Sequence, residues 1–228
     1  MDTSGLPRVM LDALTPFLWA TARYTVPLSL LSFALGLAVG FGAALARTFG
    51  PGPLRSAARF YVWIVRGTPL LVQLFLVFYG LPSVGVVLEA FPAALIGFTL
   101  NVGAYTSEIL RAAIVSVPKG QWEAAHSVGM SWSQAMRRTI LPQAARVATP
   151  PLGNSFISLV KDTSLAAAIT VPELFQSAQR VAAATYEPLA LYLEAALFYL
   201  ALSSALSALQ TRLERRLARH ASPSEYER

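Results

Sequence analysis

The chain has 228 residues, 55% of them hydrophobic and only 13% charged, whereas an average soluble domain has about a quarter of its residues charged. This composition excludes an ordinary water-soluble domain and indicates one integral membrane domain, in which the formal charge of +6 is typical of basic cytoplasmic loops and gives no reason to expect nucleic-acid binding. The chain has no cysteine and only two isolated histidines, so thiol chemistry is excluded and no metal site is expected.

Five apolar stretches are each long enough to cross a bilayer, which takes about 20 residues. In chain order, these predicted spans cover residues 20–46, 60–82, 89–111, 147–169 and 188–210. They predict a transmembrane domain over residues 16–211, preceded by an N-terminal periplasmic segment (1–15) and followed by a basic cytoplasmic tail (212–228). The first stretch is too long for a cleaved signal peptide, so we expect it to be a retained span.

Small residues mark the first predicted span. Gly36 and Gly40 have the GxxxG spacing that lets the backbone of another helix approach closely. We interpret this spacing as ordinary packing within the bundle and not as a specific dimer motif.

The distribution of positive charge predicts the orientation of the spans. The loop after the first span is basic, with Arg47, Arg55, Arg59 and Arg66 within or beside it. The segment from residue 111 to 146 and the tail are also basic, whereas the second loop has no positive charge and the fourth has only Arg180. Because basic loops stay in the cytoplasm, we expect the C-terminus inside and the N-terminus outside.

The polar segment between the third and fourth spans, residues 118–142, is predicted to contain two short helices. It is divided by four helix-breaking residues, Pro118, Gly120, Gly129 and Pro142. The first helix covers residues 121–128, and the second begins after Ser131, an N-cap with Gln134 as its reciprocal partner three residues later. A polar helical insert with an exposed acid is typical of a docking element.

This segment resembles the EAA loop of the permeases of ATP-binding-cassette (ABC) importers. The matching residues are Glu123, Ala124, Ala125, Gly129, Leu141 and Pro142. Thr139 departs from the pattern, because the family has Ile there, but Thr is also β-branched. Other stretches are similar to the branch that carries polar amino acids (His, Arg, Lys, Gln, Glu and opines): residues 66–73, 105–111, 118–125, 151–165 and 171–174.

The resemblance implies an all-α permease of the MetI-like type I importer fold, with five transmembrane helices and a cytoplasmic coupling helix, in the bacterial inner membrane. It also implies a set of residues that dock on the ATPase: Gln121, Trp122, Glu123, Ala124, Ala125, Gly129 and Pro142. The implied partners are a cytoplasmic ABC ATPase dimer, an identical or homologous second permease subunit, a periplasmic or lipid-anchored binding protein and membrane lipids. The sequence has no GxxxxGK phosphate loop, so we expect no catalytic residue and no cofactor here, with ATP bound by the partner.

Charged residues inside the predicted spans suggest a substrate pathway, because each costs about 2.5–3.5 kcal/mol to insert. We interpret Glu108 and Asp162 as acids that attract the ammonium group of an amino-acid substrate. Four polar residues are expected to add hydrogen bonds: Gln73, Asn101, Asn154 and Ser164. The alternative is pairing between helices near the inner face, with Glu108 held by Arg111 three residues later.

Two other function classes remain open. An ion-coupled secondary transporter would use the intramembrane acids as proton relays, but its inverted repeats are not visible in the sequence. A passive channel or scaffold would leave the EAA-like segment without a purpose. The sequence leaves open which amino acid is carried and whether the second permease is identical.

Overall fold

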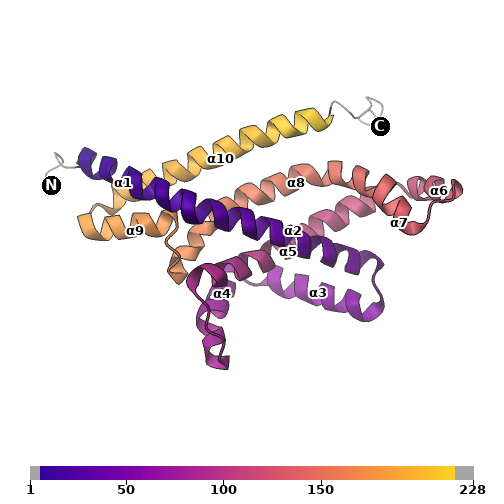
Figure 1. Ribbon diagram of the computed structural model, residues 1–228, viewed down its shortest axis with the longest axis horizontal. Helices are drawn as coiled ribbons and strands as arrows, with labels where there is room; N and C mark the ends of the chain where they lie inside the picture. The colour runs from indigo at the N-terminus through magenta and orange to yellow at the C-terminus, as the bar shows by residue number, and fades with distance from the viewer. Residues whose placement is uncertain (1–5, 219–228) are drawn as a thin grey trace.

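The structure, a computed structural model, describes residues 6–218, and its regular elements are all helical, which confirms the prediction of an all-α protein. The α-helices are α1 (Leu6–Ala20), α2 (Val26–Phe49), α3 (Gly52–Gly67), α4 (Leu70–Phe75), α5 (Ala90–Ser116), α6 (Lys119–Ser127), α7 (Trp132–Ala135), α8 (Leu141–Asp162), α9 (Leu174–Thr185) and α10 (Pro188–Ala218). Figure 1 shows an elongated bundle in which α1 and α2 form one rod, α6 and α7 lie at the end where α2 stops, and α9 lies near α1 at the other end.

Three π-helical turns interrupt the long helices, and each ends two residues before a proline. They are η2 (Thr21–Thr25) before Pro27, η3 (Leu76–Gly80) before Pro82 and η5 (Met136–Ile140) before Pro142. Proline has no N–H, and its ring crowds the carbonyl four residues earlier. The wider turn relieves this crowding, so the α-helix continues past the proline after η2 and η5, whereas after η3 the chain continues only as a 3-10 turn, Leu81–Val84.

The second predicted span is not one straight helix. Helix α3 meets the stretch Leu70–Val84, which begins with α4, at an angle of 107°. Thr68, between them, is extended with φ −120° and ψ 146°, the conformation that a residue before proline prefers, and Pro69 follows it. In Figure 1, α4 and the turns after it project away from the bundle.

Length and composition identify two stretches among the described helices that can cross a membrane: Leu6–Phe49 and Pro188–Arg215. The bent pair formed by α3 and α4 adds a third if it counts as one span. Helix α1 starts at Leu6, within the segment predicted to precede the first span, and α10 continues to Ala218. The count of five spans and their orientation stay predictions, and the rest of the predicted tail lies outside the described residues.

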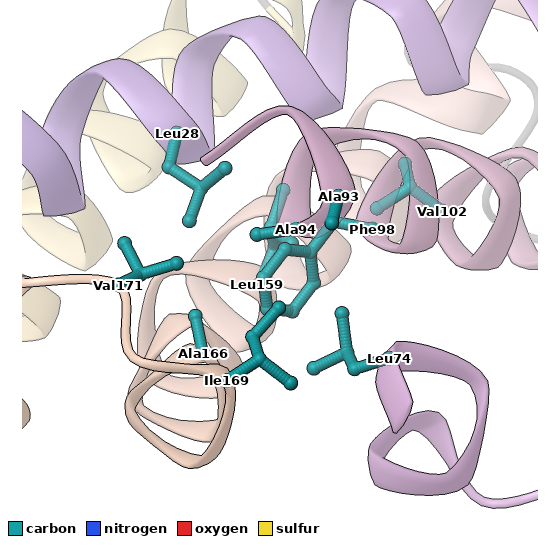
Figure 2. Close-up of a cluster of buried hydrophobic side chains, with 10 residues drawn as sticks. All are labelled: Leu28, Leu74, Ala93, Ala94, Phe98, Val102, Leu159, Ala166, Ile169 and Val171. Carbon is teal, nitrogen blue, oxygen red and sulfur yellow. The ribbon is translucent and has the colours of Figure 1, made fainter. Parts of the chain in front are cut away.

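A buried apolar cluster joins the elements around the middle of the bundle (Figure 2). Leu28 of α2, Phe98 of α5 and Leu74 of α4 are fully buried in it. Leu159 of α8 and Ile169, from the 3-10 turn η6 (Thr163–Ile169), complete its other side. The cluster therefore fixes α4, α5 and α8 relative to α2.

A buried acid, Glu173, connects helices at the end of the molecule where α9 lies. Glu173 is the N-cap of α9: its carboxylate accepts a hydrogen bond from the Gln176 amide at 2.8 Å and another from the Tyr199 hydroxyl of α10 at 2.6 Å. The side chain is fully buried. Glu173 therefore ties α9 to α10 through one carboxylate.

Replacing Glu173 with alanine is expected to lower the free energy of unfolding. The loss of the cap costs about 1 kcal/mol, and the Tyr199 hydroxyl left buried without a partner costs about 1–3 kcal/mol more. The melting temperature of the detergent-purified protein checks this. Glu89→Ala is the matched control, because Glu89 is also an N-cap but its side chain accepts no cap hydrogen bond; an equal drop in both variants would contradict the role of Glu173.

Candidate functional site

A cavity of about 1060 Å³ lies beside the junction of α3 and α4 and between α5 and α8. Its wall is mostly apolar, but several polar and charged side chains reach it. Four of the six residues predicted for the substrate pathway line it: Asn101, Glu108, Asn154 and Asp162. Such a mostly apolar hollow with a few convergent polar groups is typical of a small-molecule site.

Glu108 is held by arginines from two helices. The Arg47 guanidinium, at the end of α2, donates to one carboxylate oxygen at 2.7 Å, and Arg111, one turn along α5, donates to the other at 2.5 Å. Arg66 of α3 lies 3.8 Å from the same carboxylate. The pairing with Arg111 that the sequence offered as an alternative is present, and Arg47 and Arg66 extend it.

Asp162 is the acid whose oxygens remain available. It lies at the last residue of α8 and lines the cavity, and its side chain is exposed. Within the part of the chain that the structure describes, its carboxylate has no hydrogen bond or ion pair, in contrast to that of Glu108. A positively charged ligand group in the cavity therefore finds an unoccupied acceptor at Asp162.

The remaining predicted pathway residues have local partners. The Asn101 amide donates to the Gln73 side-chain oxygen at 3.2 Å, and Gln73 in turn donates to the Val65 carbonyl at 2.7 Å, near the end of α3. Gln73 thus holds the bend between α3 and α4 and does not line the cavity. The Ser164 hydroxyl donates to the Lys161 carbonyl at 2.8 Å and also lies outside the lining. Their contact with substrate stays a prediction, as does that of Asn154, which accepts from Gln210 of α10 at 3.1 Å.

Arg66 and Tyr105 are cavity residues that the sequence analysis did not name as pathway candidates. Arg66, counted in the sequence analysis only among the basic residues at the first loop, lines the cavity, and its guanidinium carbon lies 5.2 Å from the centre of the Tyr105 ring. Tyr105 lines the cavity as well. Both stand in stretches that resemble the amino-acid branch, and that was the signal available in the sequence.

The polar segment folds in part as the sequence predicts: α6 is a short separate helix, but the second predicted helix continues from α7 through η5 into α8. Ser131 caps α7: its hydroxyl accepts from the Gln134 amide, and the Gln134 side chain accepts from the Ser131 amide, so the predicted capping box is confirmed. Between the two helices, Gly129 adopts φ 78°, which favours glycine, and ends the turn after α6. Pro118 before it and Gly129 after it therefore delimit α6, whereas Gly120 lies inside α6 and Pro142 lies inside α8, so neither of these two breaks a helix.

The predicted docking residues divide into an exposed and an inward-facing group. Gln121, Glu123 and Ala124 are exposed on α6, whereas Ala125 is only 4% exposed and points into the protein. Trp122 is half-buried and packs beside Trp132 of α7, with 6.2 Å between ring centres. That these residues contact an ATPase stays a prediction.

The sequence matches the family described as "binding-protein-dependent transport system inner membrane component" over residues 36–219. The chain belongs to this family. It is therefore a permease subunit of an importer, located in the inner membrane. Within the described residues, no three His, Cys, Asp or Glu side chains gather where they could hold a metal ion.

Several relatives cover nearly the whole chain. It is 52% identical over 206 residues to the L-cystine transport permease TcyB of Bacillus subtilis (strain 168), and the aligned part covers 90% of this chain and 88% of the relative. It is 38% identical over 204 residues to the glutamine transport permease GlnP of Escherichia coli K12, and the aligned part covers 89% of this chain and 93% of that relative.

Solved structures agree with these matches. A structure described as an amino acid ABC transporter with histidines superposes with a TM-score of 0.87 at 34% identity, covering 95% of this chain and 100% of the other. An inward-facing MetNI methionine ABC transporter superposes with a TM-score of 0.72 at 21% identity, covering 91% and 97%, and shows the shared fold.

Proposed function

We propose that this chain forms one half of the transmembrane pathway of an ATP-driven importer of amino acids, and that the cavity beside Asp162 receives the substrate. The observation that carries the proposal is that one cavity is lined both by Asp162, a carboxylate without a partner among the described residues, and by the Arg66 guanidinium. A zwitterionic amino acid presents both an ammonium and a carboxylate group, which these two side chains complement. The relatives named for cystine and glutamine transport support this substrate class.

We infer that energy comes from a separate ATPase that docks on α6. Its exposed face offers Glu123 and Ala124, and Val128, just after the helix, is 73% exposed. The basic turn after α2 lies toward the same end of the molecule (Figure 1), which supports placing that end in the cytoplasm. We further propose that a second permease subunit closes the open side of the cavity and that a binding protein delivers substrate at the opposite end. On this proposal the chain itself catalyses nothing and binds no cofactor.

The direct test is uptake into proteoliposomes containing this chain, its ATPase and its binding protein. We expect amino-acid accumulation that requires ATP and continues when ion gradients are collapsed. A panel of cystine, amide, basic and acidic amino acids then identifies the substrate. Uptake driven by a proton or sodium gradient without ATP would support the ion-coupled alternative and overturn the proposal.

Replacing Asp162 with asparagine is expected to weaken substrate binding about tenfold or more, because a hydrogen bond to a charged group contributes about 1.5–3 kcal/mol. The substrate concentration for half-maximal uptake checks this, with the maximal rate affected less. Glu187→Gln is the control, since Glu187 is an acid that does not line the cavity. An unchanged half-maximal concentration in Asp162→Asn would remove this acid from the substrate site.

A further inference from the structure

The last turn of α2 carries two side chains that reach in different directions. Arg47 reaches α5, where it donates to the carboxylate of Glu108, a residue that lines the cavity, at 2.7 Å and to the Ser107 hydroxyl at 3.3 Å. Phe49, two residues later, reaches α6 and α7. One helical turn therefore contacts both Glu108, in the cavity wall, and the polar segment.

Phe49 meets two tryptophans of the polar segment. Its ring centre lies 5.1 Å from that of Trp132, edge to face at 75°, and 6.0 Å from that of Trp122. Edge-to-face rings at these distances attract one another with a preferred geometry. Because Phe49 is 40% exposed and Trp132 46% exposed, this contact lies outside the buried core and can adjust when α6 moves.

The polar segment is otherwise anchored by a buried cluster. Ile114 and Val117 of α5 and its end pack there against Met136 and Ile140 of η5. From α2, only the partly buried Leu45 borders this cluster among the described residues. Phe49 therefore adds a second contact between α2 and the polar segment, through Trp122 of α6 and Trp132 of α7.

Arg47 is placed to pass on a displacement of α2. Its side chain is only 14% exposed, and it holds one carboxylate oxygen of Glu108, a residue that lines the cavity. A shift of the last turn changes this ion pair directly, because Arg47 and Phe49 lie on the same turn of helix.

We propose that the last turn of α2 is a positioning relay between the ATPase and the substrate cavity. In this relay, Phe49 follows the movement of α6 and α7, and Arg47 transmits that movement to Glu108. The relay rests on the proposed function, since it requires an ATPase on α6. Phe49 and Arg47 are positioning residues, because they act through the tryptophans and through Glu108.

The test uses the complete transporter with its ATPase and binding protein, and measures substrate transported per ATP hydrolysed. In Phe49→Ala, we expect this ratio to fall about two- to thirtyfold, the range for residues along a coupling route, while ATP hydrolysis and the half-maximal substrate concentration stay near normal. Phe49→Trp, which keeps an aromatic ring, is expected to restore the ratio. Phe60→Ala is the control, because Phe60 is 60% exposed on α3 and its ring meets Trp63 and not α6 or α7.

An unchanged transport ratio in Phe49→Ala, with wild-type uptake intact, would overturn the relay and leave the proposed function standing. Absence of ATP-dependent uptake in the wild type would instead overturn the proposed function. If Phe49→Ala does not assemble, Phe49→Leu keeps the apolar volume and removes the ring, and the same ratio decides. A double variant with Arg47→Gln is expected to be no worse than the more severe single variant, because both act in one route; independent, multiplying effects would contradict it.

Discussion

Replacing Glu108 with alanine is expected to reduce uptake at least about tenfold and to destabilise the permease. The substitution leaves Arg47, Arg66 and Arg111 facing one another without their shared carboxylate. Arg47 is largely buried, so its lost partner costs about 1–3 kcal/mol or more. Repulsion among three guanidinium groups is expected to push apart α2, α3 and α5, which meet at this acid. Uptake rate and melting temperature measure the two effects.

Glu108→Gln separates charge from shape. It keeps the volume and one acceptor oxygen but removes the negative charge, so we expect a lower maximal uptake rate with a smaller change in half-maximal concentration. This is the reverse of the pattern expected for Asp162→Asn, since arginines hold both oxygens of Glu108, whereas Asp162 has no hydrogen bond or ion pair among residues 6–218. If Glu108→Gln weakened substrate binding as much as Asp162→Asn, Glu108 would be a direct ligand.

Local chemistry explains what the sequence predicted well. The capping box at Ser131 and Gln134 and the turn at Gly129 depend on residues three or four positions apart, so their spacing in the sequence is enough to identify them. The pairing of Glu108 with Arg111 is local in the same sense. The apolar stretches also predicted the helices themselves, because hydrophobic length is a local property.

Contacts between distant segments could not be predicted in this way. Arg47 reaches Glu108 across 61 residues, and nothing in either neighbourhood selects it from the other arginines of the first loop. The bend at Thr68 had a local signal, since Pro69 follows it, but proline also occurs within helices here, as at Pro150 and Pro151. Tertiary packing decides which proline bends the chain, so the second span could be predicted as apolar but not as bent.

Replacing Gly40 with leucine is expected to have the largest effect on the fold. Helices α2 and α5 pack so closely there that a Cβ at residue 40 would overlap the Thr106 hydroxyl and lie 2.9 Å from the Gly103 carbonyl oxygen. Thr106 is fully buried and its hydroxyl already donates to the Val102 carbonyl at 2.8 Å, so it has no room to move. Overpacking costs about 1–3 kcal/mol when neighbours can shift, and backbone atoms at this distance raise the cost.

Gly42→Leu provides the matched control on the same helix. A Cβ at Gly42 meets nothing within 4 Å, so the two variants share the same change in helix propensity and differ only in packing. We expect Gly42→Leu to keep the melting temperature and uptake, and Gly40→Leu to lower both. Because Arg47 joins α2 to Glu108 two turns beyond Gly40, separation of the helices is expected to break that ion pair as well. A Gly40→Leu protein that melts like Gly42→Leu would show that α2 and α5 do not depend on this close approach.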